Sequence, residues 1–330
     1  MSLLIILYST LSFILIFISS KISYKLNFVD LPNKRKIHKT ATAYTGGITI
    51  SFIFISYILF FEIENNSFKL ILASSLLISI VGFIDDRLNL SAVNKICLQI
   101  IPVFYLITYE NINLNSLGDY IYFELSLGTF KIPFTLLSVL FLINSFNYFD
   151  GLDGTLISTS ISVIINLNFL LINENFQFYF TIILIPISIF LLFNFSILKL
   201  PKMFLGDSGS LLLGFIFSFL LIYIAQQNLV HPILLAWSIA IFVYEFLSLN
   251  LIRLKNKKNI FKTGQDHLHH LFFKLTNSIL LTNLFIMILN VIFFTIGYLS
   301  FYIINSLFSL ILFVFTFFVF FIFRNKFYNN

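Results

Sequence analysis

Long apolar runs separated by short polar segments dominate the chain. A run of about 17–25 apolar residues can cross the hydrocarbon core of a membrane as a helix, and these runs alternate too little for barrel strands. Marking the runs between polar breaks predicts eleven helices, at residues 2–20, 46–61, 68–84, 95–109, 133–147, 155–172, 178–197, 210–226, 232–252, 278–299 and 301–323. We therefore expect an all-α, polytopic helical bundle that forms a single integral membrane domain over residues 1–330.

The basic residues indicate which side of the membrane each connecting segment faces. With the N-terminus outside, the inner segments are 21–45, 85–94, 148–154, 198–209, 253–277 and the tail after Phe323. Of the 20 lysines and arginines, 18 then lie inside, and only Lys69 and Lys131 lie outside. Because basic residues concentrate in cytoplasmic loops, we predict a plasma (inner) membrane protein with a cytoplasmic C-terminus.

Composition excludes several other classes of protein. Hydrophobic residues make up 59% of the 330 residues, and the mean hydropathy of +0.98 is too high for a water-soluble domain. The only cysteine, Cys97, excludes disulfides and thiolate metal sites. Residues 111–132 alternate polar and apolar positions and predict a small outer hairpin. We expect membrane lipid as a partner and no nucleic acid.

Two adjacent carboxylates, Asp85 and Asp86, stand at the boundary between a predicted helix and an inner segment. Such a pair repels itself and resists desolvation, so it needs a cation, a basic partner or open water. A solvated loop in which Arg87 is the local partner is the plainer interpretation. A cation site is the more specific one.

The next inner segment runs from Asn147 through Asp150-Gly151-Leu-Asp153-Gly154. If the preceding helix continues to Asp150, Asn147 and Asp150 share a face. The glycines would then let a ligand approach the backbone closely. A Gly-rich turn in which Asp153 caps the following helix is the alternative, and it explains Asp153 better than Asp150.

The third motif is the sequence Phe-Leu-Gly-Asp-Ser-Gly-Ser at residues 204–210. Backbone amides at a helix start, beside small side chains, make an anion-binding terminus. Asp207 would oppose a bare phosphate, so its presence suggests a metal ion that bridges to one. A simple N-cap by Ser208 or Ser210 is the alternative.

The longest inner segment, 253–277, ends in Asp266-His267-Leu-His269-His270. A structural zinc site needs about four ligands, and no thiolate is available. A basic His/Lys segment that rests on anionic lipid headgroups is the plain alternative.

Together these motifs favour one reaction class. Carboxylates, an amide, Gly-lined helix ends, Lys95 and histidines all converge on one side of a bundle. Mg²⁺ is typically held by one or two protein carboxylates plus substrate phosphates, which suits scattered Asp residues. Cations and helix N-termini stabilise a transferring phosphoryl group. We therefore predict phosphoryl transfer at the cytoplasmic membrane face.

The chain resembles the polyprenyl-phosphate N-acetylhexosamine-1-phosphate transferases (glycosyltransferase family 4, WecA/MraY type), through motifs that follow in order from Asp30 to about His270. These are Asp30 to His38 with Gly46-Gly47, Asp85-Asp86 with Leu90-Ser91-Ala92 and Lys95, Asn147 to Asp153, Gly206 to Ser210, and His267-Leu-His269. The resemblance implies transfer of an N-acetylhexosamine 1-phosphate from a UDP-sugar to undecaprenyl phosphate, with release of UMP. It also implies Mg²⁺ as cofactor, with Mn²⁺ as a substitute, and is compatible with a homodimer.

The resemblance assigns roles on the lipid and metal side of the site. Asp207 is the expected Mg²⁺ ligand, with Asn147 or Asp150 nearby. Asp85 and Asp86 resemble the catalytic pair that engages the lipid phosphate, and we expect them to position Lys95, Mg²⁺ or that phosphate. Lys95 and Asp150 complete the catalytic set.

On the donor side, the resemblance places Phe204 on the uracil and Asp153 beside it. His267 and His269 would hold the diphosphate or the sugar, and His38 belongs with these substrate-binding residues. Glu245, which lies within a predicted helix about two turns before Arg253, is expected either to pair with a basic residue inside the bundle or to line the lipid-phosphate groove, and the first, structural interpretation is preferred.

Two departures from the family pattern qualify the resemblance. Ala41-Thr42-Ala43-Tyr44 replaces the Pro-Thr-Pro-Arg that commonly precedes the double glycine, and Asp266 directly precedes His267 instead of standing a few residues earlier. His-Leu-His favours the WecA-like branch, which starts O-antigen, capsule or teichoic-type polymers, over the peptidoglycan-precursor (phospho-N-acetylmuramoyl-pentapeptide) transferases. A transporter or lipid flippase, which would tend to show repeats, and an inactive homologue are competing hypotheses.

Overall fold

The computed structural model describes residues 2–32, 40–172, 174–259, 264 and 266–329, and is almost entirely helical. The α-helices are α1 (Ser2–Lys25), α2 (Gly46–Phe60), α3 (Asn66–Leu88), α4 (Ala92–Thr108), α5 (Lys131–Asn147), α6 (Thr155–Leu170), α7 (Glu174–Asn194), α8 (Gly206–Gln226), α9 (Pro232–Ser238), α10 (Ala240–Lys255), α11 (Leu268–Thr276), α12 (Ile279–Leu299) and α13 (Ser306–Asn329). The remaining elements are the strands β1 (Val29–Asp30), β2 (Thr42–Ala43), β3 (Ser116–Tyr120) and β4 (Phe123–Ser126), and the short helices η1 (Gly128–Phe130), η2 (Ile197–Lys199) and η3 (Ser300–Ile304).

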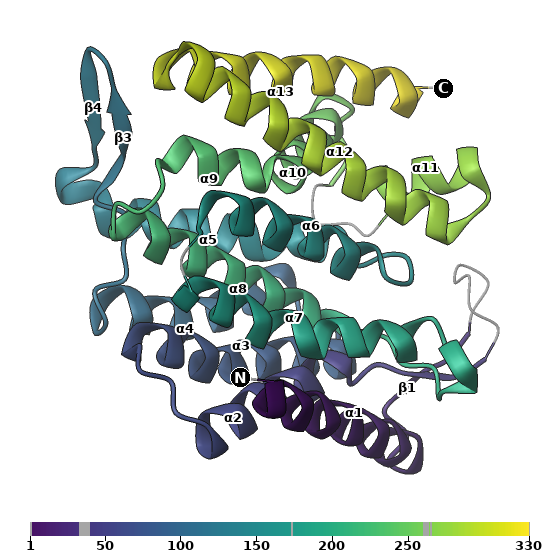
Figure 1. Ribbon diagram of the computed structural model, residues 1–330. Helices are drawn as coiled ribbons and strands as arrows, with labels where there is room; N and C mark the ends of the chain where they lie inside the picture. Colours follow the sequence, from purple (N-terminus) through teal and green to yellow (C-terminus); the bar gives the residue numbers. More distant parts are fainter. Residues whose placement is uncertain (1, 33–39, 173, 260–263, 265, 330) are drawn as a thin grey trace.

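Helix α8 lies at the centre of the bundle. It is apolar on all sides, as expected of a helix surrounded by others, and 94% of its spanning window is buried. The corresponding fractions are 22% for α1 and 11% for α13, so these outer helices present apolar side chains to lipid. Figure 1 shows α12 and α13 on one side of α8 and α1 and α2 on the opposite side. The first turn of α8, which carries Asp207, therefore has neighbours on several sides.

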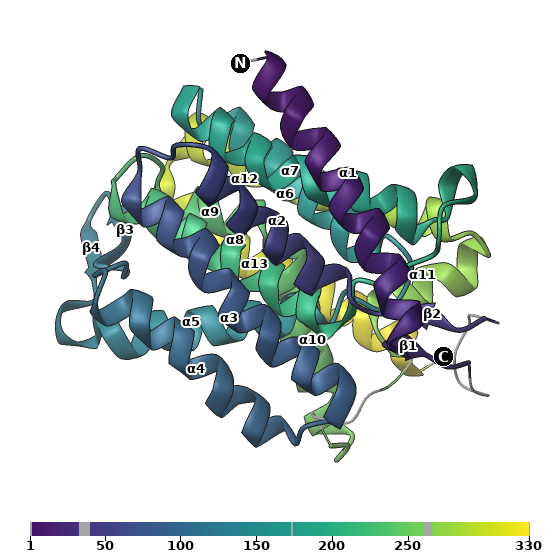
Figure 2. The same cartoon turned by 90° about the horizontal axis from the view of Figure 1, so that it is seen from below.

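The two ends of the bundle differ in character. Strands β3 and β4 form an antiparallel hairpin at one end, within the segment where the sequence predicts one. At the other end lie α11 and the antiparallel pair β1–β2, which the apolar pattern does not predict (Figures 1 and 2). The motif-bearing segments thus gather at the end of the bundle opposite the hairpin.

Seven of the described helices are long and apolar enough to cross a membrane, and α9 with α10 makes an eighth if the bent pair counts as one span. The shorter apolar helices are α2, α4 and α6. The prediction of one continuous helix over residues 232–252 is wrong, because α9 and α10 meet at an angle of 73°.

Asparagines of two neighbouring helices form hydrogen bonds with the main chain at the break between α9 and α10. The Asn290 amide donates to the Ser238 carbonyl (3.0 Å), and Asn166 donates to the same oxygen (3.4 Å).

Several residues that the sequence places in inner loops belong to helices in the structure. Asp85 and Asp86 lie in the last turn of α3 and not in a loop, and α8 begins at Gly206 and not at 210. The inner segment 253–277 contains α11. Because these polar residues are parts of helices, the helix axes fix their positions.

Helices α3 and α8 approach closely at Gly82. A Cβ atom at this position would lie 2.4 Å from the Asp207 carbonyl oxygen and 2.4 Å from the Ser208 amide nitrogen. Both atoms belong to the backbone and cannot swing away. The absence of a side chain at Gly82 is therefore what lets the start of α8 rest on α3.

We expect Gly82→Ala to destabilise the protein by about 1–3 kcal/mol, the usual cost of overpacking, although alanine favours helix more than glycine does. The thermal unfolding midpoint in detergent or nanodiscs measures this. Leu77→Ala, at a half-exposed position of the same helix, is the matched control and should shift the midpoint little. A Gly82→Ala midpoint equal to that of the unsubstituted protein would contradict the close approach.

Candidate active site

The ammonium group of Lys95 lies between two carboxylates from different helices. Its Nζ is 2.8 Å from Asp85 Oδ2, at the end of α3, and 2.5 Å from Asp207 Oδ2, at the start of α8. Lys95 itself belongs to the first turn of α4, where Ser91 caps the helix by accepting from the Asn94 amide. The structure therefore brings together three predicted site residues that are up to 122 positions apart in the sequence.

Asp86 faces the start of α8. Its carboxylate accepts hydrogen bonds from the amides of Asp207 (3.0 Å) and Ser208 (3.3 Å). A carboxylate is stabilising there because the first amides of a helix lack intrahelical partners and carry partial positive charge. The sequence predicts an anion-binding terminus at α8, and in this structure the Asp86 carboxylate is the anion that bonds two of its amides. Arg87, the local partner considered for the Asp pair, lies over the ring of Phe28.

Asn147 ends α5 beside the Lys95 cluster. With its amide oriented to satisfy both sides, the nitrogen donates to Asp207 Oδ1 (3.1 Å) and to Ser210 Oγ (2.8 Å), and the oxygen accepts from Lys95 Nζ (3.1 Å). Asn147 thus bonds both members of the Lys95–Asp207 pair. The sequence signal for this residue was its position three residues before Asp150.

Asp150 lies beyond the end of α5, because the helix ends at Asn147 and continues only as turns. Burial, together with the negative charges of Asp207 and Asp153, raises the pKa of Asp150 to about 8. A carboxyl in this environment is protonated over much of the neutral range. A cation placed near it would favour its ionised form.

Asp153 and Phe204, both expected on the uracil side, are connected through Lys202. Lys202 Nζ forms an ion pair with Asp153 Oδ2 (2.6 Å) and lies 5.3 Å from the centre of the Phe204 ring. The alternative in which Asp153 caps the next helix is wrong, because the N-cap of α6 is Gly154 and makes no side-chain bond. Lys202 was missed as a site residue, and the available signal was its place two residues before Phe204.

Main-chain bonds hold Phe204 in place. Its amide donates to the Ala43 carbonyl (2.7 Å), and its own carbonyl accepts from the Gly46 amide (3.1 Å). The segment that departs from the family pattern, residues 41–44, therefore supports this site through its backbone. Backbone contacts of this kind do not depend on the side chains that differ.

The histidines of the last motif lie at the start of α11. His267 is the N-cap residue of α11, and the His269 ring is buried against Gly151, where a Cβ would lie 2.1 Å from His269 Nε2. The two rings are parallel, with centroids 5.6 Å apart. His267 Nδ1 and His269 Nε2 are buried and have no hydrogen-bond partner among the described residues. Buried polar atoms without a partner are uncommon in folded proteins. His38 lies outside the described residues.

A cavity of about 900 Å³ opens beside the Lys95 cluster. Lys95 and Asn147 line one end of it, and Leu114 and Leu117 of the hairpin segment line the other. Its walls come mainly from apolar side chains of α5, α8 and α9. The hydropathy pattern did not predict this groove, because helix packing and the bend between α9 and α10 create it.

Comparison with known proteins identifies the family. Residues 68–225 match the model of glycosyl transferase family 4. An undecaprenyl-phosphate alpha-N-acetylglucosaminyl 1-phosphate transferase of Yersinia pestis is 30% identical over 269 residues, which cover 78% of this chain and 73% of the relative. This chain belongs to glycosyl transferase family 4.

Enzymes of the same name from two other bacteria are also similar to this glycosyl transferase. The protein of Escherichia coli strain K12 is 29% identical over 280 residues, covering 82% of this chain and 75% of its own. That of Pasteurella multocida is 29% identical over 274 residues, covering 80% and 76%. The part of this glycosyl transferase that matches the family model contains Asp85, Lys95, Asn147 and Asp207, whereas His267 lies beyond it.

The side chains around Lys95 suit a hard cation, although the described residues contain no cluster of three or more His, Cys, Asp or Glu arranged as a metal site. Asp85, Asp207 and Asn147 offer oxygen atoms, which Mg²⁺ prefers. One or two protein carboxylates are enough for Mg²⁺ when substrate phosphates supply other ligands. The donor set of this glycosyl transferase therefore fits a cation shared between protein and substrate.

His267 provides a test of the electrostatics at the histidine end. Burial lowers the pKa of His267 to about 3, although the neighbouring Asp266 acts in the opposite direction. A group with this pKa stays neutral at every pH above about 4. We therefore expect the ¹³C NMR signal of the His267 ring, assigned by its loss in His267→Gln, to keep the neutral position from pH 5 to pH 8. A titration midpoint near 6.5 would contradict the burial.

Proposed function

We propose that this glycosyl transferase moves N-acetylglucosamine 1-phosphate, or a related N-acetylhexosamine 1-phosphate, from a UDP-sugar to undecaprenyl phosphate, with release of UMP. One observation carries the proposal. Lys95 and Asn147 belong both to the charged cluster and to the lining of the 900 Å³ apolar cavity. A phosphate held at Lys95 leaves its attached isoprenoid chain in the groove. The names of the bacterial relatives support the same donor group and acceptor.

The proposed transfer is a displacement at phosphorus. An oxygen of undecaprenyl phosphate attacks the β-phosphorus of the UDP-sugar, and the bond from that phosphorus to the bridging oxygen breaks. The bridging oxygen leaves with UMP, and the products are UMP and the undecaprenyl diphosphate sugar. Because the phosphoryl group needs positioning and charge stabilisation above all, the protein contributes mainly geometry and electrostatics.

On the acceptor side, Lys95 offsets the charge of the incoming phosphate. A phosphate monoester has a second pKa of about 6, so the acceptor is largely dianionic at neutral pH and needs little deprotonation. Asp85, at 2.8 Å from Lys95, therefore orients the ammonium group and is not required as a base. Asp86 acts indirectly. It accepts hydrogen bonds from the first amides of α8 and so fixes the position of Asp207.

Asp207 and Asn147 are the residues we propose to hold Mg²⁺. Bound there, the ion would neutralise charge on the diphosphate as it is cleaved. Asn147 orients the Asp207 carboxylate through its amide nitrogen. Asp150, whose pKa is about 8, adds a negative charge to the same region only when it ionises.

On the donor side, we propose that Phe204 stacks on the uracil and that the Asp153–Lys202 pair borders the nucleotide. The 5.3 Å separation between Lys202 Nζ and the Phe204 ring centre supports this grouping. His267 and His269 are proposed to contact the diphosphate or the sugar. The packing of His267 against Tyr148 and of His269 against Gly151, which places both beside the segment that follows Asn147, supports this role.

The proposed orientation places the reaction at the cytoplasmic face of the plasma membrane. We propose that α2, α4 and α6 also cross the membrane, together with the seven longer helices and the bent α9–α10 pair, which gives eleven spans. The N-terminus then lies outside. The concentration of 18 of 20 basic residues on the inner side supports this, as does the position of the charged cluster at the end opposite the hairpin.

The pathway we propose is the start of a lipid-linked envelope polysaccharide, such as O-antigen, capsule or a teichoic-type polymer. Two competing hypotheses are the transferase that uses a UDP-N-acetylmuramoyl-pentapeptide donor for peptidoglycan, and a polytopic transporter. The family membership and the charged cluster at a helix-end groove favour the enzyme.

The test is UMP release by the purified protein in nanodiscs with undecaprenyl phosphate, Mg²⁺ and a panel of UDP-N-acetylhexosamines. We expect UMP and a lipid-linked diphosphate sugar with UDP-N-acetylglucosamine or an epimer, and loss of both on chelation of Mg²⁺. Turnover with the pentapeptide donor alone would favour the peptidoglycan hypothesis. Folded protein that releases no UMP with any donor would contradict the proposal.

A further inference from the structure

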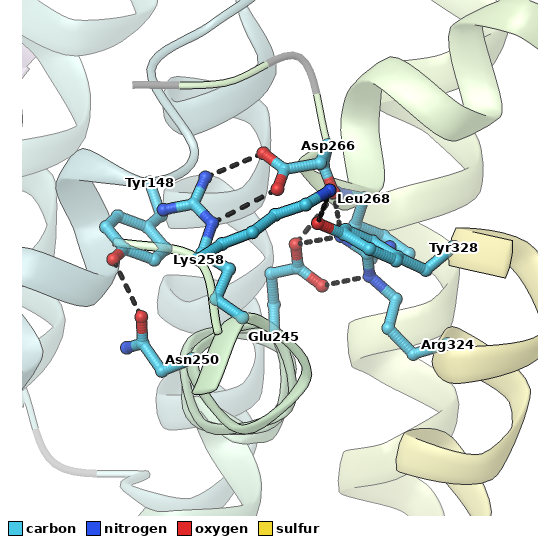
Figure 3. A network of polar contacts seen from close by, with 9 residues as sticks. Tyr148, Glu245, Asn250, Lys258, Asp266, Leu268, Arg324 and Tyr328 are labelled. Atoms are coloured by element: carbon cyan, nitrogen blue, oxygen red, sulfur yellow. Dashed lines mark hydrogen bonds and ion pairs between the residues drawn. The ribbon is translucent and has the colours of Figure 1, made fainter. Parts of the chain in front are cut away.

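A buried ion pair joins the C-terminal helix to α10. Arg324 of α13 donates through Nε to Glu245 Oε2 and through Nη2 to Glu245 Oε1, both at 2.8 Å. The two side chains are 0% and 1% exposed, respectively. The expectation that Glu245 pairs with a basic residue inside the bundle is confirmed, and Figure 3 shows that this residue is Arg324. Burying two charges is costly unless their remaining donors and acceptors find partners, so the other contacts of the pair are informative.

Those other contacts lie on the main chain at either side of His267. Glu245 Oε1 accepts a hydrogen bond from the Leu268 amide at 2.8 Å, and Arg324 Nη2 donates to the carbonyl oxygen of Asp266. Figure 3 shows Asp266 and Leu268 above the Glu245–Arg324 pair. The backbone is therefore held one residue before and one residue after His267.

The Leu268 contact supplies a cap that α11 otherwise lacks. The His267 side chain, at the N-cap position, makes no capping hydrogen bond within the described part of the chain. A helix start has four amides without intrahelical partners, and a carboxylate near them is stabilising. Glu245 provides this carboxylate from α10. The first turn of α11, which carries His269, therefore depends on a residue of another helix.

A second contact fixes the Asp266 side chain. Arg253 Nη2 lies 2.6 Å from Asp266 Oδ1, and Arg253 Nε lies 3.1 Å from Oδ2.

The ring of His267 packs edge-on against Tyr148, the residue that follows Asn147, with ring centroids 4.9 Å apart. The main-chain contacts at 266 and 268 thus set where the histidine rings lie relative to the Asn147–Asp207 end of the site.

We propose that Glu245 and Arg324 are positioning residues of the donor side, which act through the main chain of residues 266–268 to place His267 and His269. This inference rests on the proposed function. It assigns the end of the last helix a part in binding the UDP-sugar. If the pair only linked α10 to α13, the ion pair would be enough, and the hydrogen bonds to the Leu268 amide and the Asp266 carbonyl would not be needed.

The test separates positioning from stability with a double substitution, Glu245→Gln with Arg324→Met. Replacing both partners of a buried ion pair by well-packed side chains of similar volume is often close to neutral for stability, whereas removing one partner is strongly destabilising. The substituted glutamine side chain can still accept from the Leu268 amide, but the Asp266 carbonyl loses its donor. We expect a thermal midpoint near that of the unsubstituted protein, a KM for UDP-N-acetylglucosamine raised about tenfold, and a KM for undecaprenyl phosphate changed less than about threefold.

A control variant and a hydrogen-exchange measurement distinguish a positioning role from a purely structural one. Lys326→Met, at an exposed position two residues along α13, is the matched control and should leave both KM values unchanged. Hydrogen exchange of the peptide that contains residues 266–273 should speed up in the double variant and not in the control. A folded, active double variant with an unchanged donor KM, or with unchanged exchange in this peptide, would overturn the inference. Failure of the unsubstituted protein to release UMP would instead overturn the proposed function, and the assigned donor role with it.

Discussion

The charge balance around Lys95 is the interaction on which the site depends. Asp85 and Asp207 converge on this one ammonium group, and Asn147 bonds both the lysine and Asp207. Without a cation between them, carboxylates at a membrane boundary repel each other and lose hydration. Lys95 therefore allows the ends of α3 and α8 to stay together before any substrate arrives. The close backbone approach at Gly82, and the hydrogen bonds that the Asp86 carboxylate accepts from the first amides of α8, hold the same two helix ends together.

A cation placed among acidic groups also suits the phosphates of the proposed reaction. In the proposed function, Lys95 would contact an oxygen of the substrate phosphate, and Asp207 and Asn147 would hold Mg²⁺, which would neutralise charge on the diphosphate. The charges are already in place, so little reorganisation is needed during the transfer. The apolar groove beside Lys95 is lined by side chains of α5 and α8, and the proposed function places the lipid chain of the acceptor there.

The sequence predicted the chemistry of the contact between the end of α3 and the start of α8 better than its geometry. A pair of adjacent Asp residues at a membrane boundary needs a cation, a basic partner or open water, and in the structure Lys95 is the basic partner of Asp85. The distinct place of Asp86, however, depends on where α8 begins and on its contact with α3, which no local pattern contains. The break between α9 and α10 was missed for the same reason, because Asn166 and Asn290 satisfy it from distant helices.

Arg324 shows the limit of reading charge from composition alone. In the sequence it counts as one more basic residue of an inner tail, whereas in the structure it is fully buried and bonds Glu245. Basic residues near a membrane usually lie at its cytoplasmic surface. Only the tertiary fold shows that Arg324 is instead buried in an ion pair inside the bundle. The apolar groove is a similar case, since its residues look like ordinary lipid-facing positions until the helices are packed.

The most direct measurement is the kcat/KM of UMP release for Lys95→Met, compared with Lys199→Met at an exposed position of η2. If Lys95 balances the site, its loss should lower kcat/KM by at least about a hundredfold, or about 2.7 kcal/mol, with the control unchanged. A folded Lys95→Met protein whose kcat/KM stays within about threefold of the unsubstituted enzyme would contradict the account.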